Sequence, residues 1–502
     1  MHLLAQASSW VQPNVDYHAL APEIVLAAGI VVLLLVDLFL DERQKWATSS
    51  IAGLGLLAAL VPVLTLAVDG TDRSLFGGAY VVDNFALVLK ALFLITGYAV
   101  VLISTNYVDE GDYYEGEYYT LLLCSILGML MISSSRDLVS LFVALELLSI
   151  PAYMLAAWRK RDVKSNEAGM KYFLLGVFAS AVMLYGMSLL YGVTGSTLLS
   201  TIGEQLGGSA TTKPIGTLAI VFVIVGFAFK VSAVPFHSWA PDTYEGAPTP
   251  ITAFLSVASK AAGFVALLEL VFIGFFGQSN VWAPVFWVLA ALSMTVGNLV
   301  ALRQTNMIRM LAYSSIAQGG FILMPLAVIG DSPDAAKSAL TAVVTYLIIY
   351  AVMNIGAFAV VIVVARKTRS GEISSFGGLF SYAPGLCVAL TFFLFSLAGT
   401  PPLAGWVAKF VVFRSLLDAG GGWAVTLAVI GVVNSVIALF YYAAVAKEMW
   451  MNPAPDGDVS PIRIPPPLLI TVGATAALVL LIGIFPSLVL HFSDLTTLAS
   501  GS

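Results

Sequence analysis

Long apolar stretches separated by short polar ones make up almost the whole of this chain. A helix needs about 20 predominantly apolar residues to cross the roughly 30 Å hydrocarbon core of a bilayer. Fourteen stretches are long enough, so the pattern predicts an all-α polytopic membrane protein with about 14 transmembrane helices. The predicted spans are residues 18–40, 46–68, 82–104, 117–134, 137–157, 167–192, 215–245, 250–275, 281–302, 307–330, 336–365, 380–418, 422–449 and 465–492.

Two of these spans contain prolines that a continuous helix does not accommodate. The seventh is interrupted at Val234 and Pro235, and the twelfth by "AGTPPLAGW" at Ala398–Trp406. Proline removes a backbone donor and clashes with the preceding turn, so each span is predicted to consist of two half-helices. Breaks at membrane depth persist only inside protein or beside water. Paired interrupted segments are a sequence indication of an ion path in transporters.

The two breaks lie five spans apart, which predicts two inverted repeats of five helices, formed by spans 4–8 and 9–13. The chain would then have four parts. They are an N-terminal three-helix segment (1–116), a first repeat (117–275), a second repeat (276–449) and a C-terminal helix (450–502).

The composition supports a membrane protein without a redox centre of its own. Hydrophobic residues make up 59% of the chain and charged residues only 10%, with a mean hydropathy of +0.94. The two cysteines, Cys124 and Cys387, lie in apolar runs and are too few to ligate an iron–sulfur cluster. Four scattered histidines argue against a haem, and we propose no metal site. No nucleotide-binding motif is present, so energy must come from an ion gradient or a partner.

Lysine and arginine are distributed unevenly between alternate loops, and cytoplasmic loops are the ones enriched in both residues. One set of loops carries thirteen cations: Arg43, Lys45, Arg159, Lys160, Arg161, Lys164, Arg303, Arg309, Arg366, Lys367, Arg369, Lys447 and Arg463. The other set carries five: Arg73, Arg136, Lys213, Lys337 and Arg414. We therefore predict that both termini face away from the cytoplasm. The first 20 residues lack the features of a cleaved signal peptide, so the first span is predicted to be an anchor.

The remaining five cations lie inside predicted spans, and all five are lysines: Lys90, Lys171, Lys230, Lys260 and Lys409. Lysine, unlike arginine, readily gives up its proton when it is buried. This bias favours proton transfer over anchoring. Lys90 and Lys171 are nearer to span ends, however, and the alternative for them is that they extend to the membrane interface.

A buried acid is the natural partner for such lysines. Burial lowers the pKa of an ammonium group and a nearby carboxylate raises it, so a movable ion pair is a protonation switch. Glu146 lies nine residues into the fifth span, and Pro151 loosens the helix beside it. Its predicted partner is Lys230, at the first break. The alternative is a fixed ion pair that holds the bundle together.

Further candidates follow along the chain. Lys260 lies ten residues into the eighth span among small residues that leave room for water, and Lys409 follows the second break as a candidate exit site. His237 is a candidate relay between Lys230 and Lys260 because it titrates near neutrality. The alternative is a histidine satisfied by backbone groups at the break. Lys171, Asp242 and Gln318 are further candidate relays. The alternative for Asp242 is that it caps a half-helix or contacts water at the cytoplasmic side.

The segments that carry these residues resemble one known family. They are "LFVALELLSIPAYML", "EAGMKYFLLGVFASAVMLYG", "FKVSAVPFHSWAPDTYEGAPTPITAFLSVASKAAGF", "RMLAYSSIAQGGF" and "AGTPPLAGWVAKF". They are similar to the antiporter-like membrane subunits of proton-pumping NADH:quinone oxidoreductase, respiratory complex I. Mrp-type sodium/proton antiporters and membrane-bound hydrogenases share this family.

The resemblance implies a proton path through Glu146 and Lys230 as the switch, Lys260 at the centre and Lys409 toward the exit. Among the paralogues the chain is most similar to the N type, because position 409 is lysine rather than glutamate and no long C-terminal lateral helix is present. Gln318 departs from the histidine of many relatives in the tenth span. A glutamine carries no proton at neutral pH, so water would have to bridge there.

The resemblance also implies the surroundings of the chain. NADH, FMN, iron–sulfur clusters and quinone would bind to partner subunits and not to this chain. The expected neighbours are the M-type antiporter-like subunit and the small K- and J-type subunits in a bacterial inner membrane. Two alternatives remain open: a cation/proton antiporter subunit of the Mrp or hydrogenase kind, and a structural subunit whose ion pairs set helix register.

Overall fold

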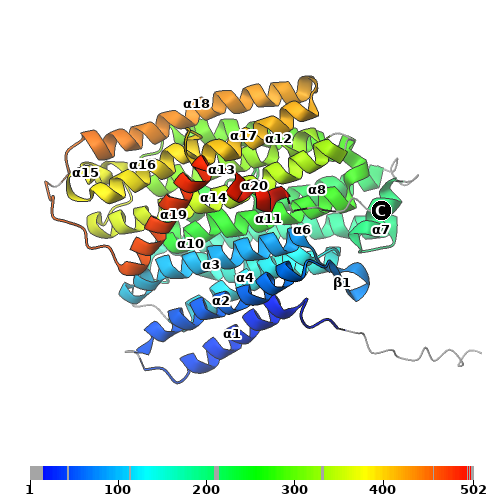
Figure 1. Ribbon diagram of the computed structural model, residues 1–502, viewed down its shortest axis with the longest axis horizontal. Coiled ribbons are helices and arrows are strands. Elements are labelled where there is room, and N and C mark those ends of the chain that lie inside the picture. Colours follow the sequence, from blue (N-terminus) through cyan, green and yellow to red (C-terminus); the bar gives the residue numbers. More distant parts are fainter. Residues whose placement is uncertain are drawn as a thin grey trace, which may run out of the picture.

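The computed structural model describes residues 15–41, 44–111, 115–207, 214–329, 333–455, 457–494, 496 and 498. Their long helices lie side by side, roughly along one direction, and form a bundle (Figure 1). The one small sheet among these residues pairs β1 (Arg73–Leu75) antiparallel with β2 (Tyr80–Val82). The chain is an all-α polytopic membrane protein, as predicted.

Eleven helical segments of the described chain are long and apolar enough to cross a membrane. They are α2 (Trp46–Asp69), α3 (Asn84–Glu110), α4 (Glu115–Ser134), α5 (Leu138–Ala156), α6 (Val163–Thr194), the segment Thr249–Gly274, α12 (Ser279–Ala301) with its preceding turn, α13 (Met307–Leu323) with its following turn, α14 (Pro333–Thr368), α18 (Gly421–Met451) and α19 (Pro466–Ile484). The first predicted span corresponds to α1 (Ala21–Asp37), and the seventh and twelfth correspond to shorter helices. The total of fourteen spans stays a prediction.

The seventh predicted span consists of two helices, which confirms the first break. They are α8 (Pro214–Lys230) and α9 (Trp239–Gly246). Near the end of α8 the carbonyl of Phe229 accepts a hydrogen bond of 3.0 Å from the indole of Trp239. In the break, the amide of Val234 donates to Ser293 Oγ at 2.9 Å. Backbone groups at the break are therefore satisfied inside the protein, as burial in a membrane requires.

The twelfth predicted span is also broken, into α16 (Pro384–Ala398) and α17 (Ala404–Ala419). Gly399 ends α16 in the left-handed region at φ 90°, which a residue with a Cβ rarely adopts. At the start of α17, a Cβ on Gly405 would lie 1.7 Å from the carbonyl oxygen of Ser396. The two half-helices can therefore meet this closely only because glycine occupies position 405.

The segment Thr249–Gly274 is continuous but not uniformly α-helical. It contains α10 (Thr249–Phe254), a π-helical turn at Leu255–Ser259, α11 (Lys260–Glu269) and a second π-helical turn at Leu270–Gly274. Nothing in the sequence pattern had indicated the π turns. The apolar stretch of this segment is 100% buried, whereas that of α18 is 28% buried. Thr249–Gly274 is thus the central helix of the bundle, and α18 lies on its outer face (Figure 1).

The remaining described helices are short: α7 (Leu199–Gly207), α15 (Leu379–Tyr382) and α20 (Ser487–Asp494). The sheet and α7 lie at one end of the bundle, which we call the hairpin end, and α15 lies at the other (Figure 1). At that other end a cavity of about 560 Å³ is lined by Arg159, Lys164, Arg366 and Arg369, and we call it the cation-rich end. Arg43 and Lys213 lie outside the described residues. The four-part division, the inverted repeats and the orientation in the membrane stay predictions.

Candidate functional site

Lys230 is the last residue of α8 and lies at the first break. Its side chain is buried, with 4% exposed. The ammonium nitrogen donates to Ser149 Oγ at 2.8 Å and to the Tyr172 hydroxyl at 3.3 Å. The C-terminal end of a helix carries partial negative charge, which favours a cation at this position. Lys230 is therefore held by two hydroxyl groups and a helix terminus.

Glu146 is half-buried on α5 and accepts a hydrogen bond of 2.6 Å from Ser180 Oγ. The structure does not place it in direct contact with Lys230, so the predicted pair is separated. Ser149, the residue that accepts from Lys230, follows Glu146 by three residues, or about 4.5 Å of helix. The Ser149 hydroxyl itself donates to the carbonyl of Leu145 at 2.6 Å, so it accepts from the lysine without donating to the acid.

A group of ion pairs lies beside Lys230, on the side toward the cation-rich end of the bundle. Asp242, in the first turn of α9, accepts from Lys171 of α6 at 2.7 Å and from Arg309 of α13 at 2.8 Å. Lys171 also pairs with Glu167 at 2.6 Å. Lys171 thus does not simply reach the interface, because two carboxylates hold it. It precedes Tyr172, the residue that contacts Lys230, so this group lies beside the lysine.

Lys260 begins α11 directly after the first π turn and is buried, with 2% exposed. Its ammonium nitrogen donates to the Ser315 carbonyl at 2.7 Å and to Ser315 Oγ at 2.6 Å. On the other side, the hydroxyl of neighbouring Ser259 lies at hydrogen-bonding range of Tyr172. Tyr172 therefore contacts both Lys230 and the residue adjoining Lys260.

Gln318 lies one turn beyond Ser315 on α13 and is buried. Its side-chain oxygen accepts a hydrogen bond from the Tyr346 hydroxyl. Its amide nitrogen donates to the carbonyl of Leu397 at 2.9 Å, at the end of α16. The glutamine thus connects the central region to the second break, although it cannot itself be charged.

Lys409 lies at the second break and is buried, with 4% exposed. Its ammonium nitrogen donates to the carbonyl of Ala398 at 2.7 Å and to Ser435 Oγ at 3.1 Å. It also lies 4.5 Å from the centre of the Phe321 ring, a favourable cation–π distance. Ala398 adjoins the Leu397 carbonyl that Gln318 contacts. The break in the twelfth span therefore supplies free helix carbonyls to two neighbouring polar side chains.

His237 does not occupy the predicted place between Lys230 and Lys260. It lies in the segment between α8 and α9, half-buried, with a buried Nδ1 that has no hydrogen-bond partner among the described residues. No hydrogen bond joins it to either lysine. Tyr172 and Ser259 occupy that place instead, because the chain turns away after Lys230.

Lys90 and Arg136 are functional candidates whose ion pairs sequence reasoning missed. Lys90 is fully buried and pairs with Glu23 at 2.8 Å, since α1 covers it, so it does not extend to the interface. Arg136 lies in the connection between α4 and α5, as predicted, but it is buried there and pairs with Asp83 at 3.0 Å and with Glu269. The isolated acid Glu269 deep in an apolar span was the signal that could have revealed such a partner.

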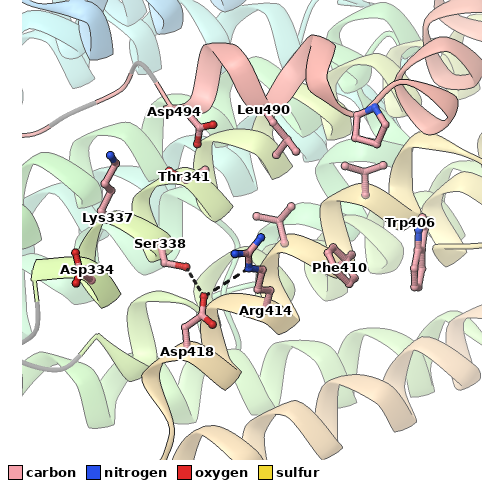
Figure 2. Close-up of a pocket in the computed structure, with 13 residues that line it drawn as sticks. Asp334, Lys337, Ser338, Thr341, Trp406, Phe410, Arg414, Asp418, Leu490 and Asp494 are labelled. Carbon is pink, nitrogen blue, oxygen red and sulfur yellow. Dashed lines mark hydrogen bonds and ion pairs between the residues drawn. The ribbon is translucent and has the colours of Figure 1, made fainter.

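One cavity of the described chain lies away from the lysines. It measures about 660 Å³ and opens between α14, α17 and α20, where Arg414 lies 3.8 Å from Asp418 (Figure 2). None of Lys230, Lys260 and Lys409 lines it. Among the described residues no group of His, Cys, Asp or Glu is placed to hold a metal ion.

Comparison with known proteins identifies the family of the chain. The sequence profile of the family described as "NADH:quinone oxidoreductase/Mrp antiporter, TM" matches residues 135–438. NADH-quinone oxidoreductase subunit N of Trichlorobacter lovleyi is 40% identical over 485 residues, which cover 96% of this chain and 97% of the relative. Subunit N of Moorella thermoacetica is 39% identical over 94% of this chain and 96% of the relative.

The chain belongs to the NADH:quinone oxidoreductase/Mrp antiporter family.

Solved structures agree with this membership. A chain of respiratory complex I from Thermus thermophilus is similar with a TM-score of 0.76 and 32% identity, covering 94% of this chain and 98% of that chain. A chain of the Mrp complex from Dietzia is similar with a TM-score of 0.82 and 21% identity, covering 95% of this chain and 96% of that chain; it shares the fold. The family match includes all four predicted proton-transfer residues. It begins after α1–α4, so Glu23, Asp83 and Lys90 lie outside it.

Proposed function

We propose that this chain is the N-type membrane subunit of a bacterial NADH:quinone oxidoreductase and moves protons through Glu146, Lys230, Lys260 and Lys409. One observation carries the proposal. Within the described chain, each of the three lysines is at least 96% buried, yet each bonds only to neutral oxygens and pairs with no carboxylate. Lys90, Arg136 and Lys171, by contrast, are all held by acids.

This difference separates cations that hold the structure from cations that can titrate. A buried ion pair keeps its cation charged, because removing either charge leaves the other unpaired. A buried lysine bonded to hydroxyl and carbonyl oxygens has no such partner, and burial favours its neutral form. Moving a proton against about 200 mV costs roughly 4.6 kcal/mol. That corresponds to about three pKa units, which is within the range that changes in burial and in a neighbouring charge produce.

The order of these residues along the bundle supports a direction for proton movement. Glu146 and Lys230 lie beside the ion pairs of the cation-rich end, Lys260 lies on the central helix, and Lys409 lies at the second break. Ser149 and Tyr172 bond to Lys230, and Gln318 lies one turn beyond the Ser315 that holds Lys260 and bonds to the second break. Protons would enter from the cytoplasm at the cation-rich end, with both termini on the opposite side.

The energy would come from quinone reduction in other subunits. NADH, FMN, iron–sulfur clusters and quinone would be bound there, since two cysteines cannot supply the ligands of a cluster in this chain. The M-type subunit and the small K- and J-type subunits would be its neighbours in a bacterial inner membrane. The names of the relatives support this placement.

Replacing Gln318 tests whether the amide bridges Lys260 and Lys409. Gln318→Leu removes both hydrogen bonds of the side chain while filling similar space. We expect proton pumping by the purified, reconstituted complex to slow by roughly tenfold, since losing a buried hydrogen bond costs about 1.5 kcal/mol. The control is Gln205→Leu on the exposed face of α7. Equal pumping rates in the two variants would exclude Gln318 from the path.

A further inference from the structure

A second group of buried charges lies at the hairpin end and is not used by the proposed path. We call it the hairpin cluster, and it consists of Glu23, Asp83, Lys90, Arg136 and Glu269. Lys90 and Glu269 are fully buried, Arg136 is 6% exposed and Glu23 is 9% exposed. Ionisable groups this deep in a membrane protein are functional candidates by default.

The cluster is built from four separate parts of the chain. Arg136, between α4 and α5, donates to Glu269 of α11 and to Asp83 Oδ2 at 3.0 Å, at the start of α3. Lys90 of α3 lies 2.8 Å from Glu23 Oε1 of α1 and donates to the Tyr80 hydroxyl at 2.9 Å. The N-terminal helices and the central helix are thus joined through charged side chains.

Backbone contacts hold the two halves of the cluster together. Tyr80 of β2 forms a bridge with Ser135, and the amide of Arg136 donates to the carbonyl of Ala79 at 2.8 Å. Asp137, the next residue, turns its carboxylate to the first turn of α5 and caps it. The short strand therefore places Tyr80 and Lys90 beside Arg136.

The charges of the cluster do not balance. Its three carboxylates face two cations, so full ionisation would leave one net negative charge in a buried site. An unbalanced buried charge is costly, and taking up one proton removes it. Glu269 Oε2 is buried and has no hydrogen-bond partner in the described chain. Burying a neutral, protonated carboxyl group in such a position costs much less free energy than burying a charged carboxylate.

The central helix connects this cluster to the lysine path. Lys260 begins α11 and Glu269 ends it, nine residues or about 13.5 Å apart. At 100° per residue the two side chains lie on opposite faces, so they do not contact each other. A π turn adjoins α11 at each end, and π turns are frequent at functional sites. A shift of this one rigid segment would move both groups together.

We propose that the hairpin cluster is a second proton-binding site, in which Glu269 takes up and releases one proton during each cycle. It would exchange that proton at the end of the bundle opposite the cation-rich end. This inference rests on the proposed function, because it assigns the site to the same pump. The other charged and titratable groups of this site are Asp83, Glu23, Lys90, Arg136 and Tyr80.

The test uses the complete complex with Glu269→Gln, and Glu204→Gln on the exposed face of α7 as the matched control. The glutamine keeps the shape and balances the cluster, so normal assembly is expected. Infrared difference spectra during turnover with NADH and quinone should contain a carboxylic-acid band that Glu269→Gln removes and Glu204→Gln retains. The number of protons pumped per electron should fall at least twofold in Glu269→Gln only. If Glu269→Gln fails to assemble, Asp83→Asn removes the same excess charge and should give the same two results.

Two outcomes would overturn the inference: spectra unchanged by the substitution, or an unchanged pumping ratio in the assembled variant. Its failure is distinguishable from failure of the proposed function. Normal pumping in Glu269→Gln with none in Lys230→Ala would exclude the hairpin cluster as a proton-binding site and would still support the lysine path. Normal pumping in Lys230→Ala would exclude the proposed proton path through the lysines.

Discussion

Lys230→Ala is expected to abolish proton pumping while the complex still assembles. The lysine contacts Ser149 and Tyr172 but no carboxylate, so its removal leaves no buried charge unpaired. Stability should therefore change little, whereas the buried ammonium group at the first break is lost. The measurement is the pH gradient formed by the reconstituted complex on adding NADH, together with the amount of assembled complex.

Two further variants complete this experiment. Lys337→Ala removes an exposed lysine at the hairpin end and should pump normally. Glu146→Ala should also abolish pumping, because it removes the acid one helical turn from Ser149. Full pumping in both Lys230→Ala and Glu146→Ala would show that neither residue carries protons, and the chain would then have a structural role.

Arg136→Gln is expected to prevent assembly of the subunit. Among the described residues, the arginine is the only ion-pair partner of Glu269 and also pairs with Asp83. Its loss leaves the carboxylates of the hairpin cluster with Lys90 as that cluster's one remaining cation. Breaking a buried pair by removing one partner costs about 3 to 5 kcal/mol, a large part of the stability of a typical domain. The measurement is the amount of this subunit in membranes and in purified complex.

The control for Arg136→Gln is Arg414→Gln. Arg414 has a 70% exposed side chain and lies 3.8 Å from Asp418, so this pair should contribute little. We expect the control to assemble at the level of the unmodified chain. Equal assembly of the two variants would mean that the hairpin cluster does not hold α11 against the N-terminal helices.

The helix breaks were predictable from the sequence because proline acts locally. The helices are interrupted at Val234–Pro235 and around Pro401–Pro402, and these breaks are local effects that do not depend on the surrounding fold. The burial of a lysine such as Lys260 was equally predictable, because a residue in the middle of an apolar span is far from both ends of that span. Depth within a span depends only on position along the chain.

The partners of those lysines were not predictable in the same way. Glu146 bonds to Ser180 and Lys230 bonds to Ser149 because of the way the helices pack, and packing is not visible in a hydropathy pattern. For the same kind of reason, the sequence does not show that the buried Nδ1 of His237 has no hydrogen-bond partner among the described residues. Arg136 sits between two apolar spans and has the sequence context of a loop. Only the folded chain shows that β2 and α11 enclose it.

The most direct test of the lysine path is the proton-pumping ratio of the complex with Lys260→Arg. Arginine keeps the positive charge beside Ser315 but stays protonated at every physiological pH. Our account predicts an assembled complex that pumps no protons through this subunit. Pumping at the level of the unmodified complex would contradict it, because a fixed charge would then serve as well as a group that titrates.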